Sequence, residues 1–204
     1  MDAQIYPCPA ALRNERLVSF DIETTGLSPL YNNIIELGVV EMVGGEIALR
    51  HSRLFGGGRS SLYTVRQVHR IRDSERRGQP PFREKARQIA GWLAGACLVS
   101  HNGMAFDLPF LQEAMKAAGV SLAVSRHYDT LRIVRRLDSP PKDAAAARAF
   151  RPKFASHRLG DLCRHYGIPY GEENHRGLAD CECTLQLLFA LCGDFGEQKV
   201  LGMA

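Results

Sequence analysis

Leu17-Val-Ser-Phe-Asp-Ile-Glu-Thr-Thr-Gly-Leu27 is the part of this 204-residue sequence that most constrains the fold. Residues 17–22 form a short run dominated by apolar side chains, which predicts a buried strand. Gly26 and the polar residues around it predict a turn directly afterwards.

Two candidate partner strands follow in the sequence. Residues 34–43 and 46–54 contain many branched apolar side chains and are separated by Gly44-Gly45, a pattern typical of a hairpin. Together with residues 17–22 they predict three early strands of antiparallel type.

Helices and strands alternate in the rest of the chain. The expected elements are short or amphipathic helices and apolar strands: helix 62–71, helix 82–93, strand 96–100, helix 108–118, strand 122–127, and helices 130–137, 157–166 and 178–192. Three strands followed by such alternation predict an α/β fold with a mixed central β-sheet flanked by helices. Residues 138–155, rich in alanine, proline and basic side chains, are expected to form a mobile basic insert.

Asp21 and Glu23 are the first candidate functional residues. Because they lie two residues apart on one strand, their carboxylates project to the same face of the sheet. Two acids at the end of an apolar strand are costly unless a cation neutralises them, and Mg²⁺ and Mn²⁺ prefer carboxylate oxygens. A solvated acidic pair is an equally good interpretation of these two residues taken alone.

Two later segments supply further polar side chains. Residues 98–111 lead from a buried strand into a helix that begins near Asp107, which is either another metal ligand or a simple complement to the helix dipole. Residues 174–184 place Asp180 in the first turns of an apolar helix, with His175 on the approach to it. Their five-residue spacing is not that of two ligands on one helical face, so His175 suits a general base near neutral pH. An ordinary surface histidine is the alternative.

The three segments resemble motifs I, II and III of the DEDDh (DnaQ-like) 3′-to-5′ exonucleases. That family includes the proofreading subunit of bacterial DNA polymerase III, RNase T, oligoribonuclease and the TREX-type nucleases. Similar landmarks occur in family order: Ile34-Ile-Glu-Leu-Gly38, Val68-His-Arg-Ile71, Asp129-Thr-Leu131 and His157-Arg-Leu-Gly-Asp-Leu162. The resemblance covers residues 17–192 and implies an RNase H-like fold.

The resemblance also implies catalytic roles. Four acids match the family's ligands for two divalent metal ions, Mg²⁺ or Mn²⁺: Asp21, Glu23, Asp107 and Asp180. His175 matches the general base. The implied reaction is hydrolysis of the 3′-terminal phosphodiester with release of a nucleoside 5′-monophosphate.

A pocket for the terminal nucleotide is implied in the same way. Six residues match its positions: Thr24, Gly26, Leu27, His69, Asn102 and Phe106. Leu27 and Phe106 could equally be ordinary core residues. The sequence departs from the family at Arg70, where a glycine is usual. The three residues between Asn102 and Phe106 give a spacing closer to that of the TREX type.

The distribution of charge suggests the kind of partner. The net charge is +4, and basic side chains gather in two blocks, with eight Lys/Arg against three acids in 66–87 and nine against three in 126–158. Such blocks either follow a polyanionic backbone or are solvated helix faces. A single-stranded DNA 3′ end is the expected partner, RNA is possible, and association with a DNA polymerase is left open.

No stretch resembles a membrane span or a secretory signal, and the six cysteines contain no C-x-x-C pair, so a reduced, cytoplasmic protein without a membrane partner is expected. Residues 17–195 are expected to form one exonuclease domain, with an N-terminal extension at 1–16 and a C-terminal tail at 196–204. Two alternatives to a DNA exonuclease are an RNA 3′-end trimming enzyme like RNase T or oligoribonuclease, and a catalytically silent nucleic-acid-binding module.

Overall fold

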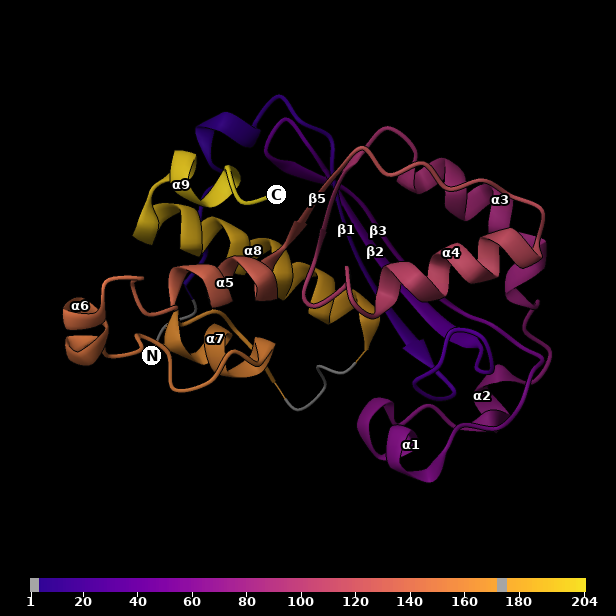
Figure 1. The fold of residues 1–204 in the computed structure, drawn as a ribbon. Coiled ribbons are helices and arrows are strands. Elements are labelled where there is room, and N and C mark those ends of the chain that lie inside the picture. The colour runs from indigo at the N-terminus through magenta and orange to yellow at the C-terminus, as the bar shows by residue number, and fades with distance from the viewer. Residues whose placement is uncertain (1–3, 172–175) are drawn as a thin grey trace.

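A five-stranded mixed sheet organises the protein, as seen in a computed structural model that describes residues 4–171 and 176–204 (Figure 1). The strands lie in the order β3-β2-β1-β4-β5. Their bounds are β1 Leu17–Thr24, β2 Ile34–Val43, β3 Glu46–Leu54, β4 Cys97–Ser100 and β5 Arg126–Asp129. β2 is antiparallel to both β1 and β3, and β4 and β5 run parallel to β1. The predicted α/β class and mixed sheet are therefore confirmed.

The alternation of side chains along β1 separates two hydrophobic cores. Val18, Phe20 and Ile22 face the core that is shared with α3 (Phe82–Leu93) and α4 (Asp107–Ala117). Leu17, on the opposite face, packs in the core that surrounds α8 (Gly177–Phe195). Since side chains of a strand alternate between faces, Asp21 and Glu23 project on the α8 side of the sheet.

Helices cover both faces of the sheet (Figure 1). α3 and α4 lie on one side, and α8 lies on the other with α5 next to it. The remaining helical elements are short: η1 Ala10–Leu12, α1 Tyr63–His69, α2 Asp73–Arg76, α5 Thr130–Leu137, α6 Ala144–Ala149, α7 Leu159–His165 and α9 Glu197–Leu201.

Some predicted bounds need correction. The strand expected over 122–127 is β5, which begins only at Arg126, because its parallel pairing starts where β4 starts, with Cys97 opposite Arg126. The insert 138–155, expected to be irregular, contains the short helix α6. Helices α2 and α9 were not predicted; four and five residues give too little periodicity to reveal a helix.

Both ends of the described chain pack against the central sheet and α8. The backbone N–H of Tyr6 donates to the side chain of Gln186 on α8, and the N–H groups of Ala10 and Ala11 donate to the carboxylate of Glu197. Val200 on α9 is fully buried. Residues 4–16 and 196–204 therefore share the core of the domain, while the division of the chain at 17 and 195 stays a prediction. None of the helices in the described ranges has the length and apolarity needed to cross a membrane.

Candidate active site

Two glycines allow α8 to approach the strand that carries the acidic pair. In the β1–β2 ladder, Gly38 lies opposite Asp21. A Cβ on Gly38 would lie only 2.1 Å from the carbonyl carbon of Gly177, and a Cβ on Gly177 would lie 2.8 Å from the Gly38 nitrogen. The backbone of the first turn of α8 therefore touches the backbone of β2, which brings Asp180 to the end of β1.

We expect Gly38→Ala to destabilise the protein by about 1–3 kcal/mol, because the added methyl group forces α8 away from β2. Hydrolytic activity should fall with it, since Asp180 moves with the helix. The matched control is Gly193→Ala on the same helix, where a Cβ meets no atom within 4 Å. That change should stabilise the helix by about 0.5–1 kcal/mol. Urea unfolding of both variants measures the difference, and equal effects would contradict the close-approach argument.

Asp107 is held at the start of α4 by a hydrogen bond from the central strand. Its Oδ1 accepts the backbone N–H of Ile22 at 3.0 Å, and only 4% of the residue is exposed. Ile22 lies between Asp21 and Glu23 in the sequence. The bond therefore fixes the third acid beside the first two, across 85 residues of chain.

The four predicted acids are close enough to influence one another. Burial, and then the charges of Asp107, Glu23 and Asp180, raise the pKa of Asp21 well above its ordinary value. Burial, and then the charge of Glu36, raise the pKa of Glu23 to about 9. Burial also raises the pKa of Asp107 to about 7, against the lowering effect of the Ile22 hydrogen bond. The site therefore gathers carboxyl groups whose joint ionisation is costly unless a cation neutralises them.

Asp180 completes the cluster from α8. Asp180 is buried. Burial raises the pKa of Tyr170, and the charge of Asp180 and a hydrogen bond with its carboxyl raise that pKa further. Asp21 and Asp180 line one cavity of about 690 Å³, and Asn102 lines it too. His101, Arg135 and Arg158 supply further polar groups to the same cavity.

Glu36 is a fifth acid of the site, which the sequence indicated only as part of a family landmark. It lies on β2, is 0% exposed, and accepts hydrogen bonds at Oε1 from Ser52 (2.9 Å) and from the guanidinium of Arg176 (3.2 Å). Its Oε2 has no hydrogen-bond partner among the described residues. An acid in the middle of an apolar strand was the available signal for it.

Arg176 connects three elements at the edge of the acidic cluster. Besides its bond to Glu36 on β2, it lies 3.7 Å from the carboxylate of Glu75 on α2, and it is the N-cap residue of α8. Its positive charge lowers the pKa of Glu23, in the opposite direction to burial and the acids. Arg176 therefore helps to fix the start of α8 and partly balances the cluster.

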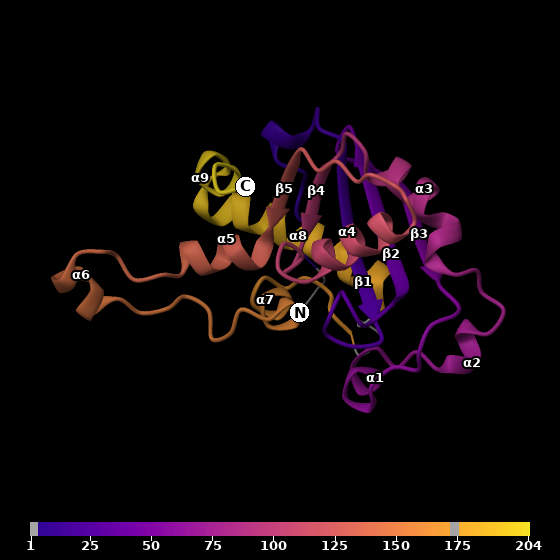
Figure 2. The same cartoon turned by 45° about the vertical axis from the view of Figure 1, so that its right-hand side comes forward.

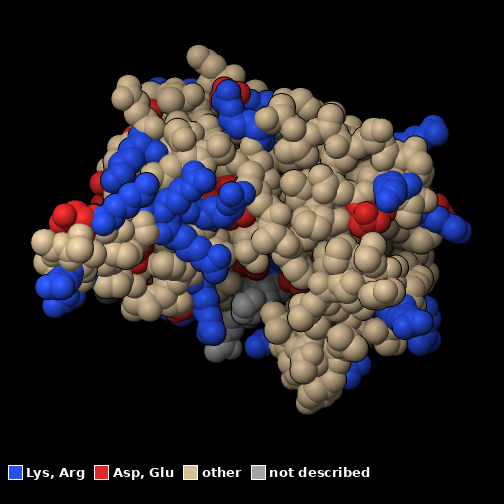
Figure 3. Space-filling view, in the orientation of Figure 1, with Lys and Arg blue, Asp and Glu red and all other residues tan. Residues whose placement is uncertain are grey.

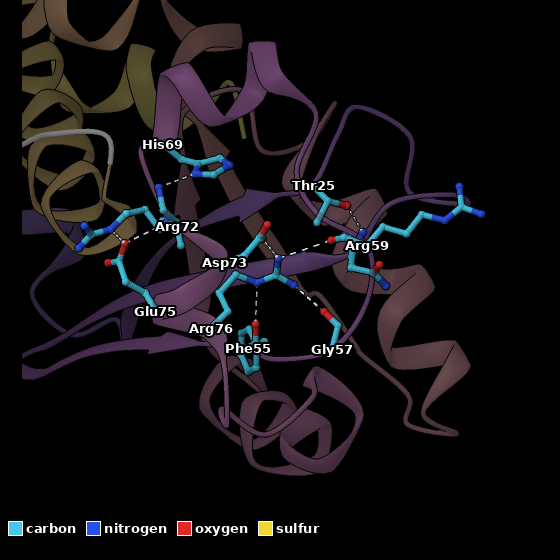
Figure 4. Close-up of polar contacts among 11 residues, drawn as sticks. Thr25, Phe55, Gly57, Arg59, His69, Arg72, Asp73, Glu75 and Arg76 are labelled. Atoms are coloured by element: carbon cyan, nitrogen blue, oxygen red, sulfur yellow. Dashed lines mark hydrogen bonds and ion pairs between the residues drawn. The ribbon is translucent and has the colours of Figure 1, made fainter.

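The segment that contains α1 and α2 is anchored by a buried arginine (Figure 4). The Arg76 guanidinium donates to the carbonyl oxygens of Phe55 and Gly57 and pairs with Asp73. His69 ends α1, is fully buried, and accepts the Ile71 N–H at Nδ1 (2.9 Å). In the described structure His69 contributes to the packing of this segment and lies outside the lining of the cavity.

Of the other predicted pocket residues, Asn102 lines the cavity, whereas Thr24, Gly26, Leu27 and Phe106 lie outside its lining. The Thr24 hydroxyl donates to the Gly26 carbonyl, an internal bond of the turn. Phe106 packs against Phe110, with ring centroids 5.1 Å apart. Leu27 is 74% exposed, which excludes the core interpretation for this side chain. The binding roles of these residues, and of Asn102, stay predictions.

Arg70 replaces the usual glycine at a position where the backbone is left-handed. It is the C-cap of α1, with φ 57° and ψ 12°. Glycine is preferred there because a Cβ is strained in that conformation. Arg70 therefore adopts a conformation that glycine adopts without strain, and its side chain is exposed.

His175, the predicted general base, lies outside the described residues. Among those described, no group of three or more Asp, Glu, His or Cys side chains has the arrangement that holds a metal ion. The chemistry of the donor set nevertheless fits hard divalent cations, because the buried carboxylates supply oxygen ligands and excess negative charge. We therefore expect the carboxylates to reorient when an ion binds.

The sheet contains a long antiparallel hairpin followed by two parallel strands, and an acidic cluster lies between β1, α4 and α8. This arrangement defines an RNase H-like fold. The sequence profile described as "Exonuclease" matches residues 18–188. The chain belongs to this exonuclease family, the DnaQ-like group that its motifs resemble. The predicted enzyme class, a nuclease acting on phosphodiesters, is confirmed at the level of the family.

Curated relatives and solved structures agree with this assignment. "DNA polymerase III PolC-type" of Bacillus subtilis is 33% identical over 190 residues, and that of Halalkalibacterium halodurans is 32% identical over 190 residues. Each alignment covers 93% of this chain and 12% of the relative, so the chain spans about an eighth of the length of these polymerases. The predicted kinship with DNA polymerase III sequences is thus confirmed.

The fold also matches that of Escherichia coli exonuclease I. Its complex with a dT13 oligonucleotide superposes with a TM-score of 0.73 at 15% identity, covering 87% of this chain and 41% of the other. A structure of exonuclease I with the inhibitor BCBP gives a TM-score of 0.76 at 14% identity, covering 91% and 43%. At such identities the similarity establishes the fold alone.

Proposed function

We propose that this chain is a two-metal-ion 3′-to-5′ exonuclease that removes nucleoside 5′-monophosphates from single-stranded DNA. The observation that supports it most is the convergence of acids from three distant segments beside one open cavity. Keeping that much buried negative charge is costly unless cations bind there. An exonuclease needs such a site, whereas a nucleic-acid-binding module does not.

The residues can be given roles in hydrolysis. Asp21, Glu23, Asp107 and Asp180 would hold the ions, which when bound lower the pKa of a water and neutralise charge on the phosphate. His175 accepts the proton of the attacking water, a role proposed from the sequence alone. Arg135 and Arg158, in the wall of the cavity, would pair with phosphate oxygens of the substrate.

An apolar rim near the end of β1 supports a substrate with unstacked bases. Leu27, Leu30 and Tyr31 follow β1, and Tyr63 begins α1; all four are largely exposed. The N–H of Leu62, the residue before Tyr63, donates to the Thr25 carbonyl, which joins α1 to this loop. Exposed aromatic and aliphatic side chains stack on bases of single strands without reading sequence.

The direct test is degradation of 5′-labelled oligonucleotides. We expect a ladder that shortens from the 3′ end in Mg²⁺ or Mn²⁺ and stops with chelator. Nucleoside 5′-monophosphate should be the released product, identified by chromatography. Cleavage of a circular strand, or degradation that persists in chelator, would contradict the proposal.

RNA trimming is the second candidate function. The same acids and cavity would serve either nucleic acid, and the difference depends on what contacts the 2′-hydroxyl. Comparing kcat/KM for DNA and RNA of identical sequence decides between them. Association with a DNA polymerase is a further proposal, suggested by the names of the relatives, and co-purification with a polymerase subunit would test it.

A further inference from the structure

Residues 138–155 form an arm that projects from the domain between α5 and α7 (Figure 2). Its neck is closed by Asp138, whose carboxylate accepts the Lys153 N–H at 2.6 Å and lies 2.8 Å from Nε2 of His157. Beyond the neck, α6 buries none of its residues. The arm therefore has a defined base but a tip that adds nothing to the hydrophobic core.

A basic surface runs from α5 onto this arm, and Figure 3 shows its blue side chains gathered over α5 and again, after an interval of other atoms, at the tip of the arm. We call it the basic track, and it consists of exposed side chains on α5 and on the arm: Arg132, Arg135, Arg136, Lys142, Arg148 and Arg151. Within residues 4–171 and 176–204, none of these six forms an ion pair with an acidic side chain. The two acids of the arm contact backbone N–H groups of the arm itself: Asp138 accepts that of Lys153 at the neck, and Asp143 caps α6.

The track begins at the active site. Arg135 lines the same cavity as Asp21 and Asp180, and it precedes Arg136 on α5. From α5 the chain enters the arm directly. Positive charge therefore continues outward from the point at which the terminal phosphodiester would be cleaved.

We propose that the basic track binds the sugar–phosphate backbone of the strand that leads away from the 3′ end in the cavity. This inference rests on the proposed function and adds where the rest of the substrate lies. Unpaired cations on a protruding, core-free arm suit a polyanion, which they bind through release of counterions and without base readout. A trinucleotide would contact only the cavity, whereas a 25-nucleotide strand would contact both the cavity and the arm.

The test compares two triple variants with equal loss of charge. Lys142→Gln/Arg148→Gln/Arg151→Gln neutralises the arm. The control, Lys85→Gln/Arg87→Gln/Lys116→Gln, neutralises residues of α3 and α4 that do not line the groove beside Leu30 and Tyr31, and these helices lie on the opposite side of the molecule from α6 (Figures 1 and 2). Binding of a labelled dT25 strand is followed by anisotropy in EDTA over a range of salt, and hydrolysis of dT25 and dT3 is followed in Mn²⁺.

The arm variant should bind dT25 at least tenfold more weakly at low salt. The slope of log K against log salt should fall by about 2, since about 0.7 counterion is released per phosphate neutralised on a single strand. Its KM for dT25 should rise while hydrolysis of dT3 stays at the wild-type rate. The control variant should match wild type in every measurement.

Equal binding of dT25 by the arm variant and wild type would overturn the proposal, and so would equal weakening by the two triple variants. Weakened capture of an acidic protein partner with unchanged dT25 binding would assign the track to that partner instead. Failure of the proposed function has a different signature, because wild type would then leave both dT3 and dT25 intact in Mn²⁺. Binding in EDTA reports on the track in either case.

Discussion

Asp21→Asn is expected to reduce hydrolysis of single-stranded oligonucleotides by about 10³-fold or more, with little change in fold. The substitution keeps the shape of the side chain and removes a buried carboxyl group that interacts with the charges of Asp107, Glu23 and Asp180. Losing one preorganised electrostatic group at a reacting centre costs on the order of 10²–10³ in rate, and a metal ligand is expected to reach the upper end or beyond.

Single-turnover hydrolysis of a 5′-labelled strand measures this effect. Glu46→Gln provides the control, because Glu46 is an exposed acid at the start of β3 and should be dispensable. Binding of the uncleaved strand in EDTA should be at least as tight for Asp21→Asn as for wild type, since a negative charge near phosphates has been removed. A rate within tenfold of wild type would show that Asp21 is not part of the catalytic centre.

Divalent ions are expected to raise the melting temperature of the wild-type chain by about 5–10 °C when present at about 100 times their Kd. Binding to the native state alone contributes about 2.7 kcal/mol at that excess, and about 1 kcal/mol moves the melting temperature of a domain of this size by about 2–4 °C. The physical source is relief of the repulsion that disfavours the charged forms of Asp21 and Glu23.

The same measurement on Asp21→Asn separates this explanation from nonspecific salt effects. Without metal the variant should melt at a higher temperature than wild type, because one buried carboxylate has been neutralised. Its response to Mg²⁺ or Mn²⁺ should be largely lost, while Glu46→Gln should respond as wild type does. A wild-type melting temperature that ignores both ions would exclude the acidic cluster as a metal site.

The position of this cluster follows from the order of the strands in the sheet. β1 is the central strand, so its end meets elements from both faces, α4 through the Ile22–Asp107 bond and α8 through the Gly38–Gly177 contact. Neighbouring strands contribute as well, since β2 carries Glu36 and β4 leads toward Asp107, whereas an edge strand would have such a neighbour on one side only. The central strand is therefore the place where acids far apart in sequence can converge.

The sequence by itself determined the first three strands, the sheet class and the candidate acids. Strands 17–22, 34–43 and 46–54 could be recognised because burial and pairing impose a local pattern of apolar side chains and a glycine turn. Asp21, Glu23, Asp107 and Asp180 could be proposed because the resemblance to known exonuclease motifs assigns them. These signals are local, because each lies within one strand, one hairpin or one sequence motif.

Only the tertiary structure decided how those segments approach one another. Nothing local to Gly38 indicates that Gly177 will lie against it, and the contact depends on two missing side chains 139 residues apart. The hydrogen bond from Arg176 to Glu36 and the position of Arg135 in the cavity wall likewise depend on contacts between segments that are distant in sequence. Periodicity reports whether a side chain is buried, but the partner that buries it is set by the packing of the whole chain.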